Sequence, residues 1–317
     1  MFGTFHIDAR SISWFHEAVQ APLKLGGQRS MIRDMTKTLL SIGHGYSAQA
    51  LARLLLPQGW TIIGTTRSTE KATHLTATGV QAVIWPGTDL APLVAKSTHV
   101  LLSAAPGEQG DPVLTTERQA FADAAHLEWV GYLSTTGVYG DHGGGWVDES
   151  TPLTPSTKRG KARKVAEEAW LSRGLPMHVF RLAGIYGPGR GPFAKIRNGT
   201  ARRVIKKNQV FSRIHVDDIA QVLAASIARP NPGAIYNVCD NDPAPPQDVL
   251  AHAAHLLGLP LPPEEDFETA QMRPMARSFY SDSKRVRNDR IREELGVKLL
   301  YPDYDTGLRA LLRQEGG

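Results

Sequence analysis

A short glycine-containing segment is the first place in the chain where residue types and spacing predict ligand chemistry. Gly43-His44-Gly45-Tyr46-Ser47-Ala48 matches the pattern G-x-G-x-x-A and follows an apolar run, Thr38–Ile42. In such a turn Gly43 permits a tight reversal, Gly45 lets the backbone approach a pyrophosphate, and Ala48 keeps helix and strand close. The helix that follows offers unpaired N–H groups to phosphate oxygens. The candidate dinucleotide contacts are Gly43, Gly45, Tyr46, Ser47 and Ala48.

The residues after the next apolar run indicate which dinucleotide would bind. An acidic residue about 20 positions beyond the glycines usually binds the ribose hydroxyls of NAD. The segment at that distance here is Thr66-Arg67-Ser68, which contains no acid. Nothing repels a 2′-phosphate, and an arginine can pair with one. The sequence therefore predicts NADP(H) as the preferred cofactor and NAD(H) as a possible one; Arg67 as an ordinary surface residue is the other interpretation.

The elements that must position these residues alternate between strand and helix. An amphipathic helix is predicted over residues 47–56, with breakers at its end, Pro57 and Gly59. The predicted strands cover residues 38–42, 61–65, 81–85, 99–103, 129–134, 177–182 and 234–238. This alternation predicts an α/β fold, a Rossmann-type doubly wound parallel sheet with a smaller mixed C-terminal part for substrate.

The chain divides into three predicted parts. Residues 1–34 hold aromatic side chains without a regular period and are expected to be a loosely ordered N-terminal extension. Residues 35–188 form the predicted NAD(P)-binding Rossmann domain, and residues 189–317 the predicted C-terminal substrate-binding part. No basic segment followed by an apolar one opens the chain, as a secretory signal would require.

Composition excludes several classes of protein. Hydrophobic residues make up 41% and charged residues 21% of the 317, which is ordinary for a globular protein. No apolar run approaches the roughly 20 residues of a membrane helix. The single cysteine, Cys239, rules out an internal disulfide and fits a cytoplasmic location. His252 and His255 have no Cys or acid at metal-ligand spacing, so no metal site is expected there.

Positive charge is concentrated in one segment. Between Lys158 and Arg213 stand fifteen Lys or Arg and two acids, a net +13 in a chain whose total is +5. Such a basic belt suits a small anionic substrate that carries a phosphate or pyrophosphate. A solvated surface is the alternative interpretation. Nucleic acid is not expected, because the belt has few interleaved aromatic residues and matches no nucleic-acid-binding module.

Five further segments carry a resemblance to a known family. They are Leu102–Pro106, Ser134–Gly140, Phe180–Gly189, Arg213–Ala220 and Tyr236–Val238. In this order they are similar to segments of the extended or atypical short-chain dehydrogenase/reductases, in the NAD-dependent epimerase/dehydratase group. The resemblance implies that Ala104 and Ala105 line the nicotinamide side and that Thr135 hydrogen-bonds a substrate oxygen. It also implies a possible homodimer, formed through the helix that carries residues 159–168.

The resemblance fails at one position. The family uses a Tyr-x-x-x-Lys pair on one helical face, in which the tyrosine transfers a proton and the lysine holds the ribose. Setting Glu167 at the family's following glutamate places Arg163 at the lysine and Arg159 at the tyrosine position; a shift by one places Lys164 and Gly160 there. Neither register supplies a tyrosine. An arginine is not a general base near neutral pH, because its pKa exceeds about 12.

The remaining candidates for the site come from loops near the strand ends. Thr135, Tyr139 and Arg163 are the candidate catalytic residues, with Arg163 also a candidate cofactor contact. Tyr186 and Arg190 are the candidate substrate contacts. For both tyrosines the alternative is structural packing. Arg159, Arg163 and Glu167 could equally form a charge stripe that faces solvent.

Two classes of function remain open from the sequence. One is an NADP(H)-dependent oxidoreductase or epimerase/dehydratase-like enzyme acting on a phosphorylated or nucleotide-linked small molecule. The other is a non-catalytic NADP(H)-binding sensor or scaffold that has lost the tyrosine. The missing tyrosine favours the second class. The retained Thr135 and the loop at Tyr186 favour the first, because a sensor has less need of a substrate-side wall.

Overall fold

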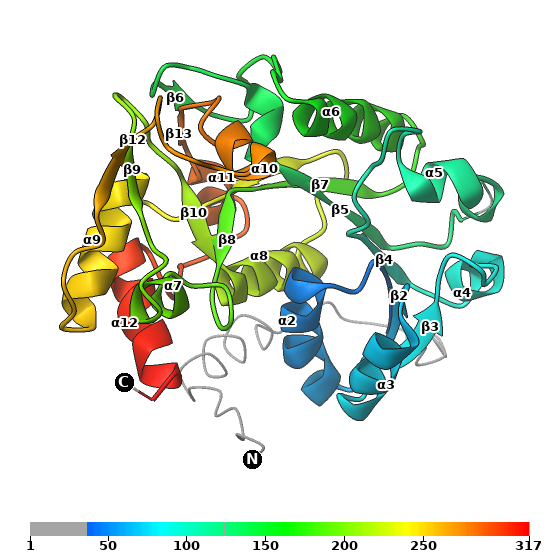
Figure 1. Cartoon of the computed structure of the whole chain (residues 1–317). Coiled ribbons are helices and arrows are strands. Elements are labelled where there is room, and N and C mark those ends of the chain that lie inside the picture. Colours follow the sequence, from blue (N-terminus) through cyan, green and yellow to red (C-terminus); the bar gives the residue numbers. More distant parts are fainter. Residues whose placement is uncertain (1–36, 123, 317) are drawn as a thin grey trace. The chain divides into compact units, whose positions relative to one another are not determined.

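A computed structural model describes residues 37–122 and 124–316 (Figure 1). Residues 37–317 form one compact unit. The predicted N-terminal extension over residues 1–34 lies outside the described residues. In the part of the chain that is described, no helix is both long and apolar enough to cross a membrane.

A seven-stranded sheet runs through the unit, and all its neighbouring strands are parallel. The spatial order is β11-β7-β5-β4-β1-β2-β3. The strands are β1 Thr38–Ile42, β2 Thr61–Thr66, β3 Gln81–Ile84, β4 His99–Leu102, β5 Trp129–Thr135, β7 Met177–Leu182 and β11 Ile235–Val238. The chain builds outward from β1 in one direction and from β4 in the other, so the strand order reverses between β1 and β4. In parallel α/β sheets, ligands bind at the carboxyl ends of the strands at this switch point.

Helices cover both faces of the sheet (Figure 1). On one face α2 (Tyr46–Leu55) packs against α8 (Val216–Ala228), and α8 accepts a 3.0 Å hydrogen bond at Ser226 Oγ from the Trp129 indole of β5. On the other face lie α4 (Ala91–Ala95), α5 (Pro112–Thr116) and α6 (Lys158–Leu171). Trp170 of α6 is fully buried there, edge-to-face with Phe121. α3 (Thr69–Ala77) flanks β2 and β3.

A second apolar core lies among helices from the C-terminal part. Phe193 of α7 (Phe193–Arg197), Ala253 of α9 (Pro246–Leu256) and Leu311 of α12 (Tyr304–Gln314) are all fully buried in it. Three parallel two-stranded pairs belong to this region: β8 (Gly184–Tyr186) with β10 (Arg213–His215), β9 (Arg203–Ile205) with β12 (Glu264–Asp266), and β6 (Trp146–Val147) with β13 (Arg285–Val286). The short elements are η1 Leu56–Gln58, η2 Gln119–Phe121, η3 Thr136–Tyr139, α10 Pro274–Ser278 and α11 Asp289–Glu293.

The predicted fold class is confirmed. Each of the seven predicted strands is present within one residue of its predicted ends, and the helix predicted over residues 47–56 is α2. On that helix Leu51 and Leu55 are buried, whereas Leu54 is only half-buried. The boundary at residue 188 stays a prediction; α8 and β11, which follow it in sequence, belong to the layers of the main sheet.

Buried histidines give the fold a dependence on pH. Burial lowers the pKa of four of them to about 4: His44, His99, His178 and His215. The pKa of a histidine in the unfolded chain is near 6.5, so between about pH 6.5 and pH 4 the unfolded chain binds protons that the folded protein does not. The folded state therefore loses stability as pH falls through this range. Two buried carboxyls oppose the trend, because burial raises the pKa of Asp218 to about 7 and that of Asp240 well above its usual range. The histidines outnumber them, so we expect stability to fall on acidification.

His44→Leu is expected to reduce this acid sensitivity. Among residues 37–122 and 124–316, neither ring nitrogen of His44 has a hydrogen-bond partner, and the ring packs against Gly64, so leucine removes a group that must charge in the core. The slope of unfolding free energy against pH below about pH 6 should fall by up to about 1.4 kcal/mol per pH unit. Denaturant unfolding across this range checks it, with His74→Leu, at an exposed position of α3, as control. Equal slopes for wild type and His44→Leu would contradict the prediction.

Candidate functional site

The glycine turn lies at the switch point of the sheet. Gly43 has φ +81°, and a Cβ there would lie 2.7 Å from the backbone nitrogen of Ala104, just after β4. Gly43 N donates to Thr65 Oγ1 and His44 N to Thr65 O, both at 2.8 Å. The turn is therefore held against two neighbouring strands, and only glycine fits its first position.

Gly45 and the start of α2 leave room for a phosphate. Gly45 is exposed, and a Cβ there would have only Gly43 O within 4 Å, at 3.7 Å. It occupies the N-cap of α2 in an extended conformation, with no side-chain cap and no acid in the first turn of the helix. Ser47 and Ala48 are buried in that turn. The free N–H groups and the positive end of the helix dipole thus face an open space that suits an anion.

Tyr46, the first residue of α2, joins the turn to the loop after β8. Its hydroxyl donates to Pro188 O at 2.9 Å. The guanidinium of Arg190 lies 5.2 Å from the centre of the Tyr46 ring, in cation–π contact. This brings a predicted substrate contact, Arg190, to the predicted cofactor turn. Tyr186, the other predicted substrate contact, is buried and points elsewhere: a Cβ on Gly307 would lie 1.9 Å from its hydroxyl.

The end of β2 leaves Arg67 free. Arg67 is exposed and has no hydrogen-bond or ion-pair partner among the described residues. Its neighbours are engaged locally, since Thr66 Oγ1 accepts from Ser68 N at 3.4 Å and Ser68 Oγ caps α3 by accepting from Lys71 N at 3.3 Å. A guanidinium in this state can turn towards an added ligand at little cost.

Small residues follow β4 and a hydroxyl follows β5. The backbone N–H groups of Ser103 and Ala104 both donate to Ile42 O, which ties the end of β4 to that of β1. Ala104 is half-buried and Ala105 exposed, so neither fills the space in front of the sheet. Thr135 is half-buried at the end of β5, and its Oγ1 accepts from Gly137 N at 3.2 Å.

Arg163 reaches from α6 to the sheet. Its Nη1 donates to Leu133 O at 2.6 Å and to the Tyr132 hydroxyl at 3.1 Å, and the residue is 6% exposed. Lys164 turns away and donates to Leu153 O. Of the two registers left open by the sequence, the one with Arg163 at the lysine position therefore faces the sheet. A solvent-facing charge stripe is wrong for Arg163 and Glu167, which are buried; Arg159 is exposed.

Glu167 continues this inward face and holds a buried network. Arg181 of β7 donates to its carboxylate through Nε and Nη2, the latter at 2.8 Å, and Ser134 donates to Oε1. Arg181 Nη1 donates to the Tyr139 hydroxyl at 2.9 Å, and that hydroxyl donates to Asn237 Oδ1 at 2.7 Å. The network joins α6 to β5, β7 and β11.

Tyr139 belongs to this interior network and not to an open site. It is fully buried, and burial raises the pKa of its hydroxyl to about 12. Burial also raises the pKa of the Tyr186 hydroxyl. Both phenols are enclosed by protein, which supports the packing role that the sequence left open for each. Proton transfer by Tyr139, the other role considered, would require the Arg181 and Asn237 contacts to break.

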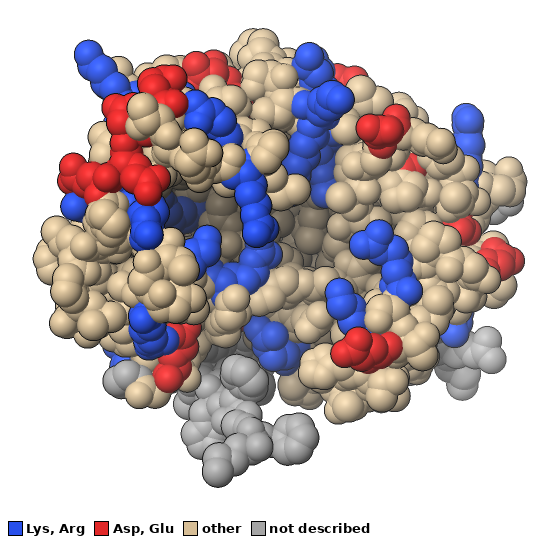
Figure 2. Space-filling view, viewed as in Figure 1, with Lys and Arg blue, Asp and Glu red and all other residues tan. Residues whose placement is uncertain are grey.

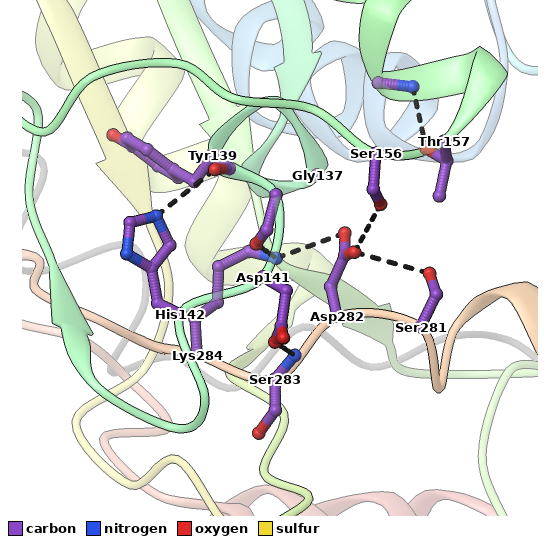
Figure 3. A network of polar contacts seen from close by, with 12 residues as sticks. Gly137, Tyr139, Asp141, His142, Ser156, Thr157, Ser281, Asp282, Ser283 and Lys284 are labelled. Carbon is purple, nitrogen blue, oxygen red and sulfur yellow. Dashed lines mark hydrogen bonds and ion pairs between the residues drawn. The ribbon is translucent and has the colours of Figure 1, made fainter.

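Polar contacts that the sequence did not predict fix the loop after Tyr139 and the start of α6 (Figure 3). Ser283 N donates to Asp141 Oδ1 at 2.7 Å, and the buried Lys284 donates to Gly140 O at 2.7 Å. Ser156, two residues before α6, donates to Asp282 Oδ1 at 2.6 Å. These partners are more than a hundred residues apart, so no local sequence pattern signals them. The segment 281–284 thereby holds the α6 N-terminus, which carries Arg159.

Two cavities lie elsewhere. One of about 360 Å³ is lined by α4 and η2 residues such as Ala95 and Gln119, and one of about 420 Å³ by Gly144, Lys206 and Arg285. No residue of the Gly43–Ala48 turn lines either cavity. The face that contains the start of α2 is nevertheless hollowed near its middle, and Lys and Arg side chains surround that hollow (Figure 2). The hollow has the charge that an anionic ligand requires.

Comparisons with known proteins identify relatives that cover most of this chain. Protein YeeZ of Escherichia coli (strain K12) is 28% identical over 283 residues, covering 84% of this chain and 97% of its own. The 3-diazoavenalumate denitrifying reductase of a Streptomyces species is 29% identical over 231 residues, covering 68% of this chain and 63% of its own. A solved structure, a functionally unknown conserved protein from Silicibacter pomeroyi, is 61% identical with a TM-score of 0.85, covering 88% of this chain and 99% of its own.

A family model covers most of the site described above. It matches residues 42–239, from the last residue of β1 to the residue after β11. That range includes the glycine turn, Thr135, the inward face of α6 and the loop that carries Arg190. The chain belongs to the NAD dependent epimerase/dehydratase family.

Proposed function

We propose that this protein binds a nicotinamide dinucleotide at the Gly43–Ala48 turn and acts as an oxidoreductase or epimerase/dehydratase-like enzyme. The observation that carries the proposal is the turn itself. Gly43 is locked against Ala104 at the switch point, while Gly45 and the uncapped start of α2 leave open space for a pyrophosphate. A bound nicotinamide would supply or accept the hydride. In this proposal Arg163, whose Nη1 donates to Leu133 O, holds the ribose.

The Thr135 hydroxyl at the edge of the sheet favours a catalytic role over a non-catalytic sensor. Thr135 stands half-buried at the end of β5, with a hydroxyl that can orient a substrate oxygen. The Streptomyces relative is named a reductase. The second candidate, a sensor or scaffold, is favoured by the absence of tyrosine from residues 158–171 of α6. Hydride transfer from NADPH to any member of a panel of carbonyl compounds and sugar nucleotides would separate the two.

We propose NADP(H) as the preferred cofactor, with Arg67 pairing with the 2′-phosphate. Arg67→Ala is expected to weaken NADPH binding by about 10-fold or more and to leave NADH binding within about 2-fold, because only NADPH carries the group that the guanidinium would bind. Calorimetric titration of both cofactors measures this. Arg118→Ala removes an exposed arginine far from the turn in sequence and serves as control. Equal losses for both cofactors would contradict the assignment.

The substrate in this proposal is a small anionic molecule, phosphorylated or nucleotide-linked. The support is the positive charge around the hollow and the contact of Arg190 with Tyr46 (Figure 2). A homodimer through α6 and a cytoplasmic location belong to the proposal as well; Val165 of α6 is an exposed apolar side chain at 62%, and Cys239 is free and buried.

Titration of the full chain with NADPH and NADH, read by quenching of its tryptophans, tests the core of the proposal. Binding of either cofactor with a Kd in the micromolar range, corresponding to about −8 kcal/mol, is the expected result. Absence of binding by both cofactors, in a protein shown to be folded by circular dichroism, would overturn the proposed function.

A further inference from the structure

Three arginines, two from α6 and one from the loop after β8, lie at the edge of the sheet that carries the glycine turn. Arg159 and Arg163 stand one helical turn apart on α6, and Arg163 is fixed at the end of β5 by Leu133 O. Arg190 follows β8 and lies over Tyr46, the first residue of α2. β1 and β5 both pair with β4, so Arg163 and Arg190 are anchored at the ends of the two strands that flank β4.

These arginines carry positive charge without an acid to balance it. None of the three forms an ion pair with a described residue. Two acids of neighbouring elements are already engaged, Glu167 with Arg181 at 2.8 Å and Asp217 with Arg53 at 3.1 Å. Partial desolvation lowers the pKa of Arg159, although its side chain still reaches solvent, and the positive charges of Arg163 and Arg190 lower that pKa further. Like charges held together at a partly desolvated edge repel one another, and a bound anion relieves this.

The three arginines differ in whether their guanidinium donors are available to a ligand. The Nη1 donor of Arg163 is used by the protein, and the side chain is buried. Arg159 and Arg190 are exposed, and neither guanidinium donates a hydrogen bond to a described residue. Their guanidinium donors are thus available to a ligand, while the Arg190–Tyr46 contact and the Thr157 cap of α6 fix where they stand.

We propose that Arg159 and Arg190 together bind one anionic group of the substrate, a carboxylate or a phosphate, in front of the ends of β1 and β5. Guanidinium groups bind either anion through paired, charge-assisted N–H···O bonds. The inference rests on the proposed function, and it names the residues that select the substrate. Arg159 stands where the family resemblance expects the tyrosine that transfers a proton, and it supplies a positive charge there instead. The proposed site therefore selects substrates that carry an anionic group.

Anion binding to the full chain, with and without saturating NADPH, tests this proposal. Inorganic phosphate and benzoate serve as probes of the two anion classes, and calorimetry gives their affinities. We expect one or both probes to bind the NADPH-loaded wild type. Arg159→Gln and Arg190→Gln should each weaken that binding by about 10-fold or more. Lys161→Gln, the same loss of charge at an exposed position of α6, is the control and should have no effect.

Each outcome has a definite meaning. Loss with both arginine variants supports the proposal, and the probe that binds identifies the anion class. Absence of binding by both probes, or equal affinities in Arg159→Gln and Lys161→Gln, overturns it. Competition between a probe and NADPH also overturns it, because the arginines would then serve the cofactor's own phosphates. Failure of wild type to bind NADPH or NADH would instead defeat the proposed function. Thermal midpoints equal to that of wild type exclude misfolding of the variants.

Discussion

Gly43→Ala is expected to abolish dinucleotide binding and to lower the stability of the fold. The new Cβ would lie 2.7 Å from Ala104 N and 3.1 Å from Ala104 Cα, both backbone atoms at the end of β4. Backbone cannot move aside as a flexible side chain can, so the turn must shift. The positive φ of +81° adds about 1–2 kcal/mol of strain for any residue with a Cβ. A displaced turn withdraws the N–H groups of α2 from the position where a pyrophosphate would bind.

Gly59→Ala is the matched control for this substitution. Gly59 has the same φ of +81°, but no atom lies within 4 Å of the Cβ it would gain. It should therefore lose about 1 kcal/mol from backbone strain alone, with NADPH affinity unchanged. Thermal unfolding and NADPH titration of both variants separate the effect of the steric clash at position 43 from that of the positive φ, which both glycines share. Wild-type NADPH affinity in Gly43→Ala would remove the observation on which the proposed function rests.

The central strands of the main sheet could be predicted from sequence because they are buried on both faces, whereas the edge strand β3 is exposed at both ends. Every residue of β1 and β4 is buried, so each appears in the sequence as a short run in which apolar residues predominate. The three small strand pairs lacked such a signal. β12 contains only acidic residues, Glu264-Glu265-Asp266, and pairs with β9 some 60 residues earlier. The pairing of this short acidic segment with a distant three-residue strand follows from tertiary packing, which no local periodicity encodes.

The glycine turn could be predicted because its chemistry is local to a few consecutive residues. The direction of a single side chain is not local in this way. A tyrosine at position 139 offers a phenol to either a site or a core, and the choice is made by Arg181 and Asn237, which are 42 and 98 residues away. In the same way the burial of Arg163 depends on Leu133 O. The composition of α6, which is rich in Lys and Arg, gave no sign that one of its faces is buried.

Glu167→Gln is expected to destabilise the protein by about 3–5 kcal/mol, because it leaves the Arg181 guanidinium buried without a counter-charge. The two side chains are 2% and 3% exposed, and their shortest ion-pair distance is 2.8 Å. Glutamine keeps the shape of the side chain and so isolates the loss of charge. Glu315→Gln breaks a pair with Arg197 of similar length, 2.6 Å, in which both side chains are partly exposed, and should cost no more than about 1 kcal/mol. Denaturant unfolding measures both variants.

The network around Glu167 also predicts how the loss spreads. Glu167 accepts hydrogen bonds from Ser134 of β5 and Arg181 of β7, and Arg181 orients the Tyr139 hydroxyl towards Asn237 of β11. One turn of α6 separates Glu167 from Arg163, so loosening this contact should also weaken NADPH binding, through the position of Arg163. A double variant with methionine at both 167 and 181 removes the two charges together and should recover much of the lost stability, since no buried ion then lacks a partner. If Glu167→Gln costs no more than Glu315→Gln, the ion pair does not hold α6 to the sheet, and the placement of Arg163 must depend on its bonds to Leu133 and Tyr132 alone.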